Sequence, residues 1–370
     1  MKFIPLALPG ISETDIEAAA RVMRSGNLVQ GAEVSALEKE IADYLGVRYA
    51  VAASSGTATL HLALAALGVG PGDEVIVPAF SFVATANVVE IVGARCRFVD
   101  IEADTFNIDV SKFEENITPR TKAVIPVHEF GLACDIAKLA EIAEKHNVPV
   151  IEDAACALGA RENGRFTGSF GRIGSFSLHP RKAVTSGEGG ILTTGDEQLA
   201  NSFRVLRNHG IKTKDGRTDF VAAGFNYRMT DFQAALVRGQ FARLDEIIDR
   251  RARLAAVYFE ELKDAENVRL PLVPEGKRHT WQTFHVTVGE RFDRDELIEK
   301  LKRRGIGANY GAQCIPHQTY YREKYGLDCA REFPNALRAF QKGLALPMYD
   351  RLSADDVRFV CRTLKELLRD

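Results

Sequence analysis

The sequence predicts an α/β fold, with a mostly parallel sheet between helices and a smaller C-terminal α+β unit. Over the first two thirds of the chain, short apolar runs alternate with helical patterns, which is typical of βαβ units. The pattern changes after a long, charged helical segment that ends near residue 262. The chain has 370 residues, and this length favours more than one folding unit.

Six apolar runs are expected to form strands of the large sheet. They are residues 74–78, 96–99, 122–126, 148–151, 173–177 and 190–193. Helical patterns separate and surround them, at 14–24, 33–45, 57–67, 82–92, 135–146, 196–207 and 230–262. Because such apolar strands are buried on both sides, we expect helices to cover both faces of the sheet.

The C-terminal part of the sequence shows a different pattern of strands and helices. It contains a strand at 284–288, helices at 293–304 and 353–368, and an irregular stretch rich in Tyr and Pro at 309–335. We therefore expect a large domain of residues 1–250, with an extreme N-terminus free to pack on the second unit, and a small domain of residues 251–370. A single large domain is the alternative.

Composition excludes several classes of function. The chain has 48 Lys and Arg against 50 Asp and Glu, so no charge surplus favours nucleic acid or an anionic membrane as a partner. No stretch approaches the roughly 20 apolar residues that span a bilayer, and prolines interrupt the short apolar run near the N-terminus. The six scattered cysteines form no metal or disulfide pattern. We expect a cytoplasmic protein without a metal.

A cradle for an anion is expected where Ser54-Ser55-Gly56-Thr57 leads into an Ala/Leu-rich helix. The first turn of a helix has unpaired N–H groups, and a glycine there lets a phosphate approach the backbone. The alternative is an ordinary N-cap without a ligand. Neither the phosphate-binding loop of nucleotide hydrolases nor the dinucleotide fingerprint occurs in the sequence.

Two charged side chains lie a few residues after apolar runs. Asp153 comes after the run at 148–151, and the small residues behind it leave room for a flat ligand. Lys182 lies in a polar loop after the run at 173–177, where burial can lower the pKa of an amine that reacts as a nucleophile. The alternatives are a helix-capping acid and a surface lysine.

Two more side chains complete a set. Ser177 precedes Lys182 and could donate to the same phosphate as Thr57, while Phe82 follows the run at 74–78 and could stack on a planar ring. Core packing is the alternative for the phenylalanine. A phosphate cradle, a stacking ring, an acid and a lysine together are what pyridoxal 5'-phosphate (PLP) requires, since it needs a lysine Schiff base and an acid beside its ring nitrogen.

In their residues and in their order along the chain, the motifs resemble those of the DegT–StrS family of sugar aminotransferases, which are fold-type I PLP enzymes. The resemblance covers nearly the whole chain. It rests on residues 4–12, 25–46, 54–87, 126–131 (PVHEFG), 150–160 (VIEDAACALGA), 176–190 (FSLHPRKAVTSGEGG), 207–210, 224–236 (GFNYRMTDFQAAL) and 333–353. It implies a large domain built on a mostly parallel, seven-stranded sheet.

The resemblance also implies a role for each matching residue. Lys182 would form the Schiff base, Asp153 would pair with the pyridine nitrogen, and Phe82 would stack on the ring. The phosphate would be held by Gly56, Thr57 and Ser177, and by Asn226 of the neighbouring subunit, so that a homodimer shares its active sites.

Two positions depart from the family pattern. The residue three after the aspartate is often Gln or His, which bonds the phenolic oxygen of the cofactor, but here it is Cys156, a poor hydrogen-bonding substitute. The segment 309–317 lacks the His-Tyr pair that often precedes Pro-x-His in the sugar-contact region. These departures leave the identity of the sugar open.

The function that the resemblance implies is transfer of an amino group, from glutamate, to a nucleotide-linked keto-sugar used in polysaccharide or lipopolysaccharide biosynthesis. The glycine-rich segment 185–190 is more similar to members that act at sugar position 4, or on cyclitol ketones, than at position 3. Two rival classes remain. An iron–sulfur dehydratase of this fold would replace the lysine by histidine, and a regulatory dimer would bind PLP without turnover.

Overall fold

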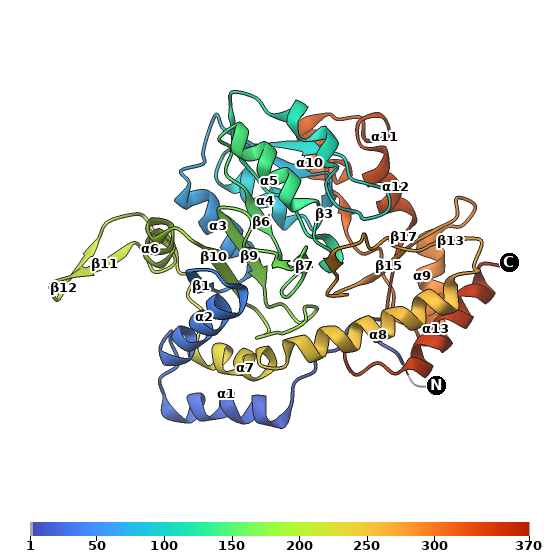
Figure 1. Ribbon diagram of the computed structural model, residues 1–370, viewed down its shortest axis with the longest axis horizontal. Coiled ribbons are helices and arrows are strands. Elements are labelled where there is room, and N and C mark those ends of the chain that lie inside the picture. Colours follow the sequence, from blue (N-terminus) through green and yellow to red (C-terminus); the bar gives the residue numbers. More distant parts are fainter. Residues whose placement is uncertain (1–2, 370) are drawn as a thin grey trace.

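The computed structural model describes residues 3–369, and a twisted sheet lies at its centre (Figure 1). Within these residues, the sheet consists of a four-stranded ladder in the order β1-β10-β9-β6 and a three-stranded ladder in the order β4-β2-β5. Parallel bridges from Val124 to Val150 and from Val127 to Asp153 join β5 to β6. The resulting order is β1-β10-β9-β6-β5-β2-β4, and β10 runs antiparallel to both of its neighbours while the other pairs are parallel.

The strands of this sheet are short and almost entirely buried. They are β1 (Tyr49–Ala53), β2 (Glu74–Pro78), β4 (Arg95–Val99), β5 (Thr121–Val124), β6 (Ile151–Asp153), β9 (Ile173–Ser177) and β10 (Gly190–Thr194). The predicted α/β class with a mostly parallel seven-stranded sheet is confirmed. The sequence reading missed β1, because its alanine-rich YAVAA run carries little β signal. It also placed β6 too early, since the pairing with β9 begins only at Ile151.

Helices cover both faces of the sheet. They include α2 (Ala32–Leu45), α3 (Gly56–Ala66), α4 (Ala84–Ile91), α5 (Ile136–Lys145) and α6 (Glu197–Leu206), while α1 (Glu13–Ser25) packs on the outside of α7 (Asp231–Phe241). Local signals set their ends: Ser12 and Asp15 form a capping box at the start of α1, and Gly26 closes that helix with a left-handed backbone. The residues between these signals match the predicted helices within a few positions.

The helix expected at 230–262 is two helices, α7 (Asp231–Phe241) and α8 (Leu244–Leu262). The break lies at Arg243, whose backbone is not helical and whose guanidinium donates to the Gly239 carbonyl at 2.7 Å and to Asp15 Oδ2 at 2.7 Å. The arginine thereby links the break to α1. The helical periodicity continues on both sides, so the sequence pattern alone did not reveal the interruption.

The C-terminal part contains a small antiparallel sheet of β13 (Val268–Arg269), β15 (Phe284–Val288) and β17 (Gly343–Leu346), with β15 in the middle. Helices α8, α9 (Arg294–Arg303) and α13 (Ala354–Leu367) pack with it around a second apolar core. Ile4 joins this core, and its N–H donates to the Gly305 carbonyl at 2.8 Å. The division of the chain at residue 250 stays a prediction, because α8 runs through that point.

The stretch at 309–335, expected to be irregular, is partly helical. It holds α10 (Thr319–Tyr325) and α11 (Cys329–Glu332) and runs into α12 (Pro334–Lys342). Tyr321 and Phe333 from this stretch are buried in the core that covers the large sheet. These helices are short, and their aromatic residues are placed by tertiary packing rather than by a clear helical period.

The remaining strands form small ribbons at the edges of the fold. They are β3 (Phe80–Ser81) with β16 (Gln313–Cys314), the trio β7 (Arg161–Glu162), β8 (Arg165–Phe166) and β14 (Lys277–Arg278), and the hairpin β11 (Ile211–Lys214) with β12 (Arg217–Phe220). The hairpin projects from the body of the protein (Figure 1), and Phe220 at its base, opposite Ile211, is 67% exposed. No helix among residues 3–369 is long and apolar enough to cross a membrane.

Candidate active site

The predicted site residues gather at one edge of the large sheet. Asp153 ends β6 and Ser177 ends β9, Gly56 begins the helix that follows β1, and Lys182 lies in the loop between β9 and β10. Carboxyl ends of parallel strands meet at the same edge of a sheet, and ligands of open α/β sheets bind there. Residues far apart in the sequence therefore converge, as the predicted set requires.

The phosphate cradle is formed where α3 meets the end of β9. Ser55 caps α3, accepting a hydrogen bond from the Ala58 N–H at 3.0 Å. A side chain at Gly56 would place its Cβ 2.8 Å from the Ser177 Cβ and 3.2 Å from its hydroxyl oxygen. Only glycine allows this approach, and Thr57, next to it, is exposed. The free N–H groups of the helix start and the two hydroxyls form a site suited to a phosphate.

The carboxyl group of Asp153 is held by a small network, and the residue is only 4% exposed. Its Oδ2 accepts a hydrogen bond from the Thr85 hydroxyl at 2.8 Å, and Thr85 in turn lies 2.9 Å from the Ser81 hydroxyl. Its Oδ1 accepts from the Ala155 N–H at 3.2 Å. Burial raises the pKa of Asp153, while the hydrogen bond from Thr85 and the charge of Lys182 oppose that rise. A cationic ring nitrogen would compensate the buried charge.

Phe82 is 63% exposed although it directly follows the buried strand β3. The Phe82 carbonyl accepts a hydrogen bond from the N–H of Thr85, the residue that holds Asp153, so the ring belongs to the same end of the sheet. An exposed phenylalanine at this point has apolar surface that a planar ligand could cover. The core-packing alternative for Phe82 does not fit this exposure.

The amine of Lys182 donates to the Sγ of Cys156 at 3.1 Å. The backbone N–H of Lys182 donates to the His179 carbonyl at 2.8 Å, which fixes the turn that carries it. Burial raises the pKa of the Cys156 thiol, and the charge of Lys182 opposes this rise. The thiol is therefore a weak, neutral partner, so little stabilisation would be lost when the amine reacts with a ligand.

The sequence reading missed one residue of this region, Glu129. It is 5% exposed, it follows β5, and its Oε2 has no hydrogen-bond partner among residues 3–369. Burial raises its pKa to about 8, the charge of Lys182 opposes that rise and the charge of Asp153 adds to it. The signal was present, because Glu129 is an acid just after an apolar run, as Asp153 is.

Asn226 is exposed, and its backbone pairs with Asn208 beside the β11–β12 hairpin. The carbonyl of its neighbour Tyr227 accepts a hydrogen bond from the Ser54 N–H at 2.8 Å, so this segment lies against the loop of the phosphate cradle. The role of Asn226 in a second subunit stays a prediction.

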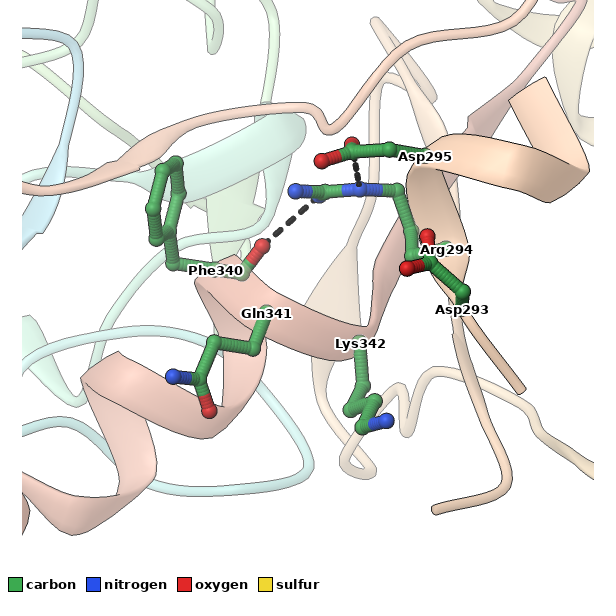
Figure 2. A pocket seen from close by; sticks show the side chains of 6 residues that line it. All are labelled: Asp293, Arg294, Asp295, Phe340, Gln341 and Lys342. Atoms are coloured by element: carbon green, nitrogen blue, oxygen red, sulfur yellow. Dashed lines mark hydrogen bonds and ion pairs between the residues drawn. The ribbon is translucent and has the colours of Figure 1, made fainter. Parts of the chain in front are cut away.

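A separate hollow lies at the start of α9, lined by Asp293, Arg294, Asp295, Phe340, Gln341 and Lys342 (Figure 2). The Arg294 guanidinium in it already donates to Asp295 Oδ1 at 2.6 Å and to the Phe340 carbonyl at 2.7 Å. Its charge is thus engaged within the protein. This hollow lacks the convergence of cradle, acid and amine found at the sheet edge.

The residues at the sheet edge fit PLP. Because residue 56 is glycine, the Ser177 hydroxyl can lie close to the start of α3, where a phosphate would bind. The buried Asp153 needs a positive partner, and among residues 3–369 the Lys182 amine donates to the weak acceptor Cys156 Sγ. Among residues 3–369, no cluster of His, Cys, Asp or Glu that could hold a metal ion occurs.

The sequence is similar to those of known aminotransferases. The model of the DegT/DnrJ/EryC1/StrS aminotransferase family matches residues 9–365. The spore coat polysaccharide biosynthesis protein SpsC of Bacillus subtilis (strain 168) is 37% identical over 380 residues, covering 99% of this chain and 97% of the relative. The UDP-4-amino-4-deoxy-L-arabinose–oxoglutarate aminotransferase of Shewanella sediminis (strain HAW-EB3) is 37% identical over 383 residues, covering 99% and 98%.

Solved structures show the same fold. Spr1654 from Streptococcus pneumoniae in its PMP form has a TM-score of 0.94 at 30% identity, covering 99% of this chain and 98% of that chain. Its PLP form has a TM-score of 0.93 at 30% identity, covering 99% of both chains.

Proposed function

This chain belongs to the DegT/DnrJ/EryC1/StrS aminotransferase family, and on that premise we propose that it transfers an amino group from glutamate to a nucleotide-linked 4-keto-sugar. It is an aminotransferase, and its cofactor is PLP. The observation that carries the proposal is the convergence of the Lys182 amine, the Asp153 carboxylate and the Gly56–Ser177 cradle at one sheet edge.

The choice of substrates is supported by the relatives. One is named for a UDP-linked 4-amino sugar and for oxoglutarate, the keto acid that glutamate becomes when it gives up its amino group. The other is named for polysaccharide biosynthesis. A sugar aminated at position 4 while linked to a nucleotide agrees with both names and with the glycine-rich segment 185–190.

PLP, when bound, supplies an aldehyde that takes up an amino group and a ring that holds electrons during proton transfer. Lys182 would hold the cofactor through Nζ in the resting enzyme. Once displaced, the same Nζ can take up and return a proton, because an amine with one weak thiol partner is free to move. Phe82 would cover one face of the ring and keep water from it.

Asp153 would hold the ring nitrogen in its protonated form. Its two oxygens are oriented by Thr85 and by the Ala155 N–H, so the carboxylate is in place before the ligand arrives. Gly56, Thr57 and Ser177 would bind the phosphate and thereby fix the position of the ring along the sheet edge.

We also propose a homodimer that shares its active sites. Asn226 would reach the phosphate bound by the partner subunit, and the exposed Phe220 and Val221 at the base of the β11–β12 hairpin offer apolar surface for the contact. Six free cysteines agree with a reducing compartment such as the cytoplasm, which is where nucleotide-linked sugars would be met.

The test is a panel of nucleotide-linked 3-keto and 4-keto sugars and cyclitol ketones, each supplied with glutamate and read by mass spectrometry. We expect the amine of a 4-keto sugar together with oxoglutarate. Amination of a cyclitol alone would replace the proposed acceptor. No conversion of bound PLP by glutamate would favour a regulatory, PLP-binding dimer instead.

A further inference from the structure

Glu129 is a buried acid that no part of the proposed function uses. Its Oε2 is without a hydrogen-bond partner among residues 3–369, which is unusual, because buried polar atoms are nearly always paired. Its backbone is well fixed: the Glu129 N–H donates to Asn107 Oδ1 at 2.8 Å, and the N–H of the preceding His128 donates to the Asp153 carbonyl at 3.0 Å. A rigid loop therefore carries a carboxyl group with one unpaired oxygen beside Asp153.

The strand order shows which side of the site this acid occupies. The phosphate cradle lies at β1 and β9, Asp153 ends β6, and Glu129 follows β5 on the far side of β6 from the cradle. The same loop contacts the segment after β6, because a Cβ at Gly131 would lie 3.0 Å from the Cys156 carbonyl oxygen. Glu129 thus lies opposite the cradle, next to Cys156.

The chemistry of the cofactor identifies what faces that side. In PLP, the phosphate arm occupies one edge of the ring, and the phenolic oxygen occupies the other edge, between the ring nitrogen and the aldehyde carbon. With the phosphate at Gly56, the nitrogen at Asp153 and the aldehyde at Lys182, the phenolic edge faces the loop after β5. We propose that Glu129 is a positioning residue that donates a hydrogen bond to the phenolic oxygen of PLP.

This inference rests on the proposed roles of Lys182 and Asp153. It also accounts for the cysteine at this edge, because the Cys156 thiol is a weak donor and cannot replace an amide or an imidazole there. A carboxylic acid in its neutral form is a good donor, and an unpaired Oε2 gains a partner when PLP binds.

The protonation state of Glu129 agrees with a donor. Burial raises its pKa to about 8, Lys182 and Arg181 oppose the rise, and Asp153 adds to it. The carboxyl group is therefore mostly protonated at neutral pH and loses its proton as the pH rises above about 8. The titratable groups around it are Lys182 and Arg181 from the β9–β10 loop, Asp153 and Cys156 after β6, His128 on its own loop, and His279 and His285 across a small cavity.

The experiment compares the wild type with Glu129→Leu, Glu129→Gln and a matched control, Glu144→Gln, which changes an exposed carboxyl group on α5. Apoprotein is titrated with PLP to obtain the dissociation constant, and the visible absorption of bound PLP is followed from pH 6 to 10. Borohydride reduction of the wild type with PLP, followed by peptide mapping, first locates the attached lysine.

We expect Glu129→Leu to weaken PLP binding about tenfold and to move the pH titration of the bound chromophore by about one unit, as the loss of one buried hydrogen bond implies. Glu129→Gln keeps an N–H donor, so its affinity should stay within about threefold of the wild type. It should also lose any step near pH 8, because an amide does not titrate. The control should behave as the wild type.

Unchanged affinity and an unchanged pH titration in folded Glu129→Leu would overturn the inference. If that variant fails to fold, the near-isosteric Glu129→Gln decides, and a persistent step near pH 8 counts against a Glu129 donor. Label on a lysine other than Lys182 would instead refute the proposed function. The two failures are therefore distinguishable.

Discussion

Replacing Asp153 by Asn tests the chemical centre of the site with a change of only a few atoms. The carboxylate accepts hydrogen bonds from the Thr85 hydroxyl at 2.8 Å and from the Ala155 N–H at 3.2 Å. An amide oxygen can keep one of these bonds, and Thr85 can turn its hydroxyl toward Ser81 to accommodate the new N–H. We therefore expect the variant to fold and to retain PLP.

Turnover should nevertheless fall steeply. A neutral amide cannot hold a proton on the ring nitrogen, so the ring no longer withdraws electrons when Nζ of Lys182 moves a proton. Loss of one preorganised electrostatic partner costs about 3–4 kcal/mol of transition-state stabilisation, which corresponds to a fall in kcat of about 10²–10³. The KM for glutamate should change much less, because Asp153 acts in the transition state.

The assay is the half-reaction with glutamate in a stopped-flow spectrometer, in which each enzyme is loaded with PLP to the same occupancy. Thr85→Val serves as the control, since it removes one bond to Asp153 and keeps the charge. Its rate should fall by about tenfold at most. An Asp153→Asn rate within a few-fold of the wild type, at equal occupancy, would refute the role given to this carboxylate.

Four further changes test the rest of the site. Gly56→Ala should weaken PLP binding by at least about tenfold, measured by titration of apoprotein, because the new Cβ would meet Ser177 at 2.8 Å. Lys182→Ala should abolish turnover without lowering the melting temperature, and turnover that persists in this variant alone would contradict the role of Lys182. Dissociated and reassociated chains of inactive Lys182→Ala and impaired Asn226→Ala should regain activity as heterodimers, and verified heterodimers without activity would exclude a shared site. Glu152 is fully buried and accepts hydrogen bonds from the backbone N–H groups of residues 168, 170 and 171, so Glu152→Gln should lower the free energy of unfolding by about 3–5 kcal/mol in urea titrations. An unchanged midpoint would refute a structural role for this acid.

Much of the fold could be predicted because its signals are local. Apolar runs between helical periods mark the βαβ units, and capping residues such as Ser12 mark helix ends. The site residues could be proposed for a related reason, since Asp153 and Lys182 follow strands whose carboxyl ends meet. The predictions were wrong where tertiary contacts determine the local structure. Arg243 at the break is bonded to Asp15, which lies 228 residues earlier in the chain, and α10 is placed by aromatic packing against the large sheet.

Glu129 is a site residue that could not be predicted from the sequence, again because tertiary contacts decide its role. Its position after a strand was visible, but its lack of a partner depends on where Asp153, Cys156 and the β9–β10 loop lie in space. Hydrogen-bond satisfaction is a property of the folded neighbourhood and leaves no trace in the residue pattern. A sequence can therefore suggest an acid at the sheet edge without showing whether that acid supports the fold or faces a ligand.

Two neighbouring acids at the end of β6 show how the fold separates these tasks. Glu152 points away from Asp153, because successive strand residues face opposite sides, and it is fully buried. It accepts hydrogen bonds from the backbone N–H groups of residues 168, 170 and 171, and from His128 Nε2 at 2.9 Å. The His128 Nδ1 accepts from the Cys134 N–H at 3.1 Å, so the ring is oriented from both sides.

These bonds tie the end of β6 to the loop after β5, the loop that carries Glu129. One acid of the pair is thus saturated with donors and rigidifies the sheet edge, while Asp153 and Glu129 retain oxygens that a ligand can meet. A site that must hold a flat ring within a few tenths of an ångström needs such a support, because its working side chains can be no better positioned than the strand ends beneath them. We therefore regard the His128–Glu152 pair as the structural support that keeps Asp153 and the partly unpaired Glu129 side by side at this edge.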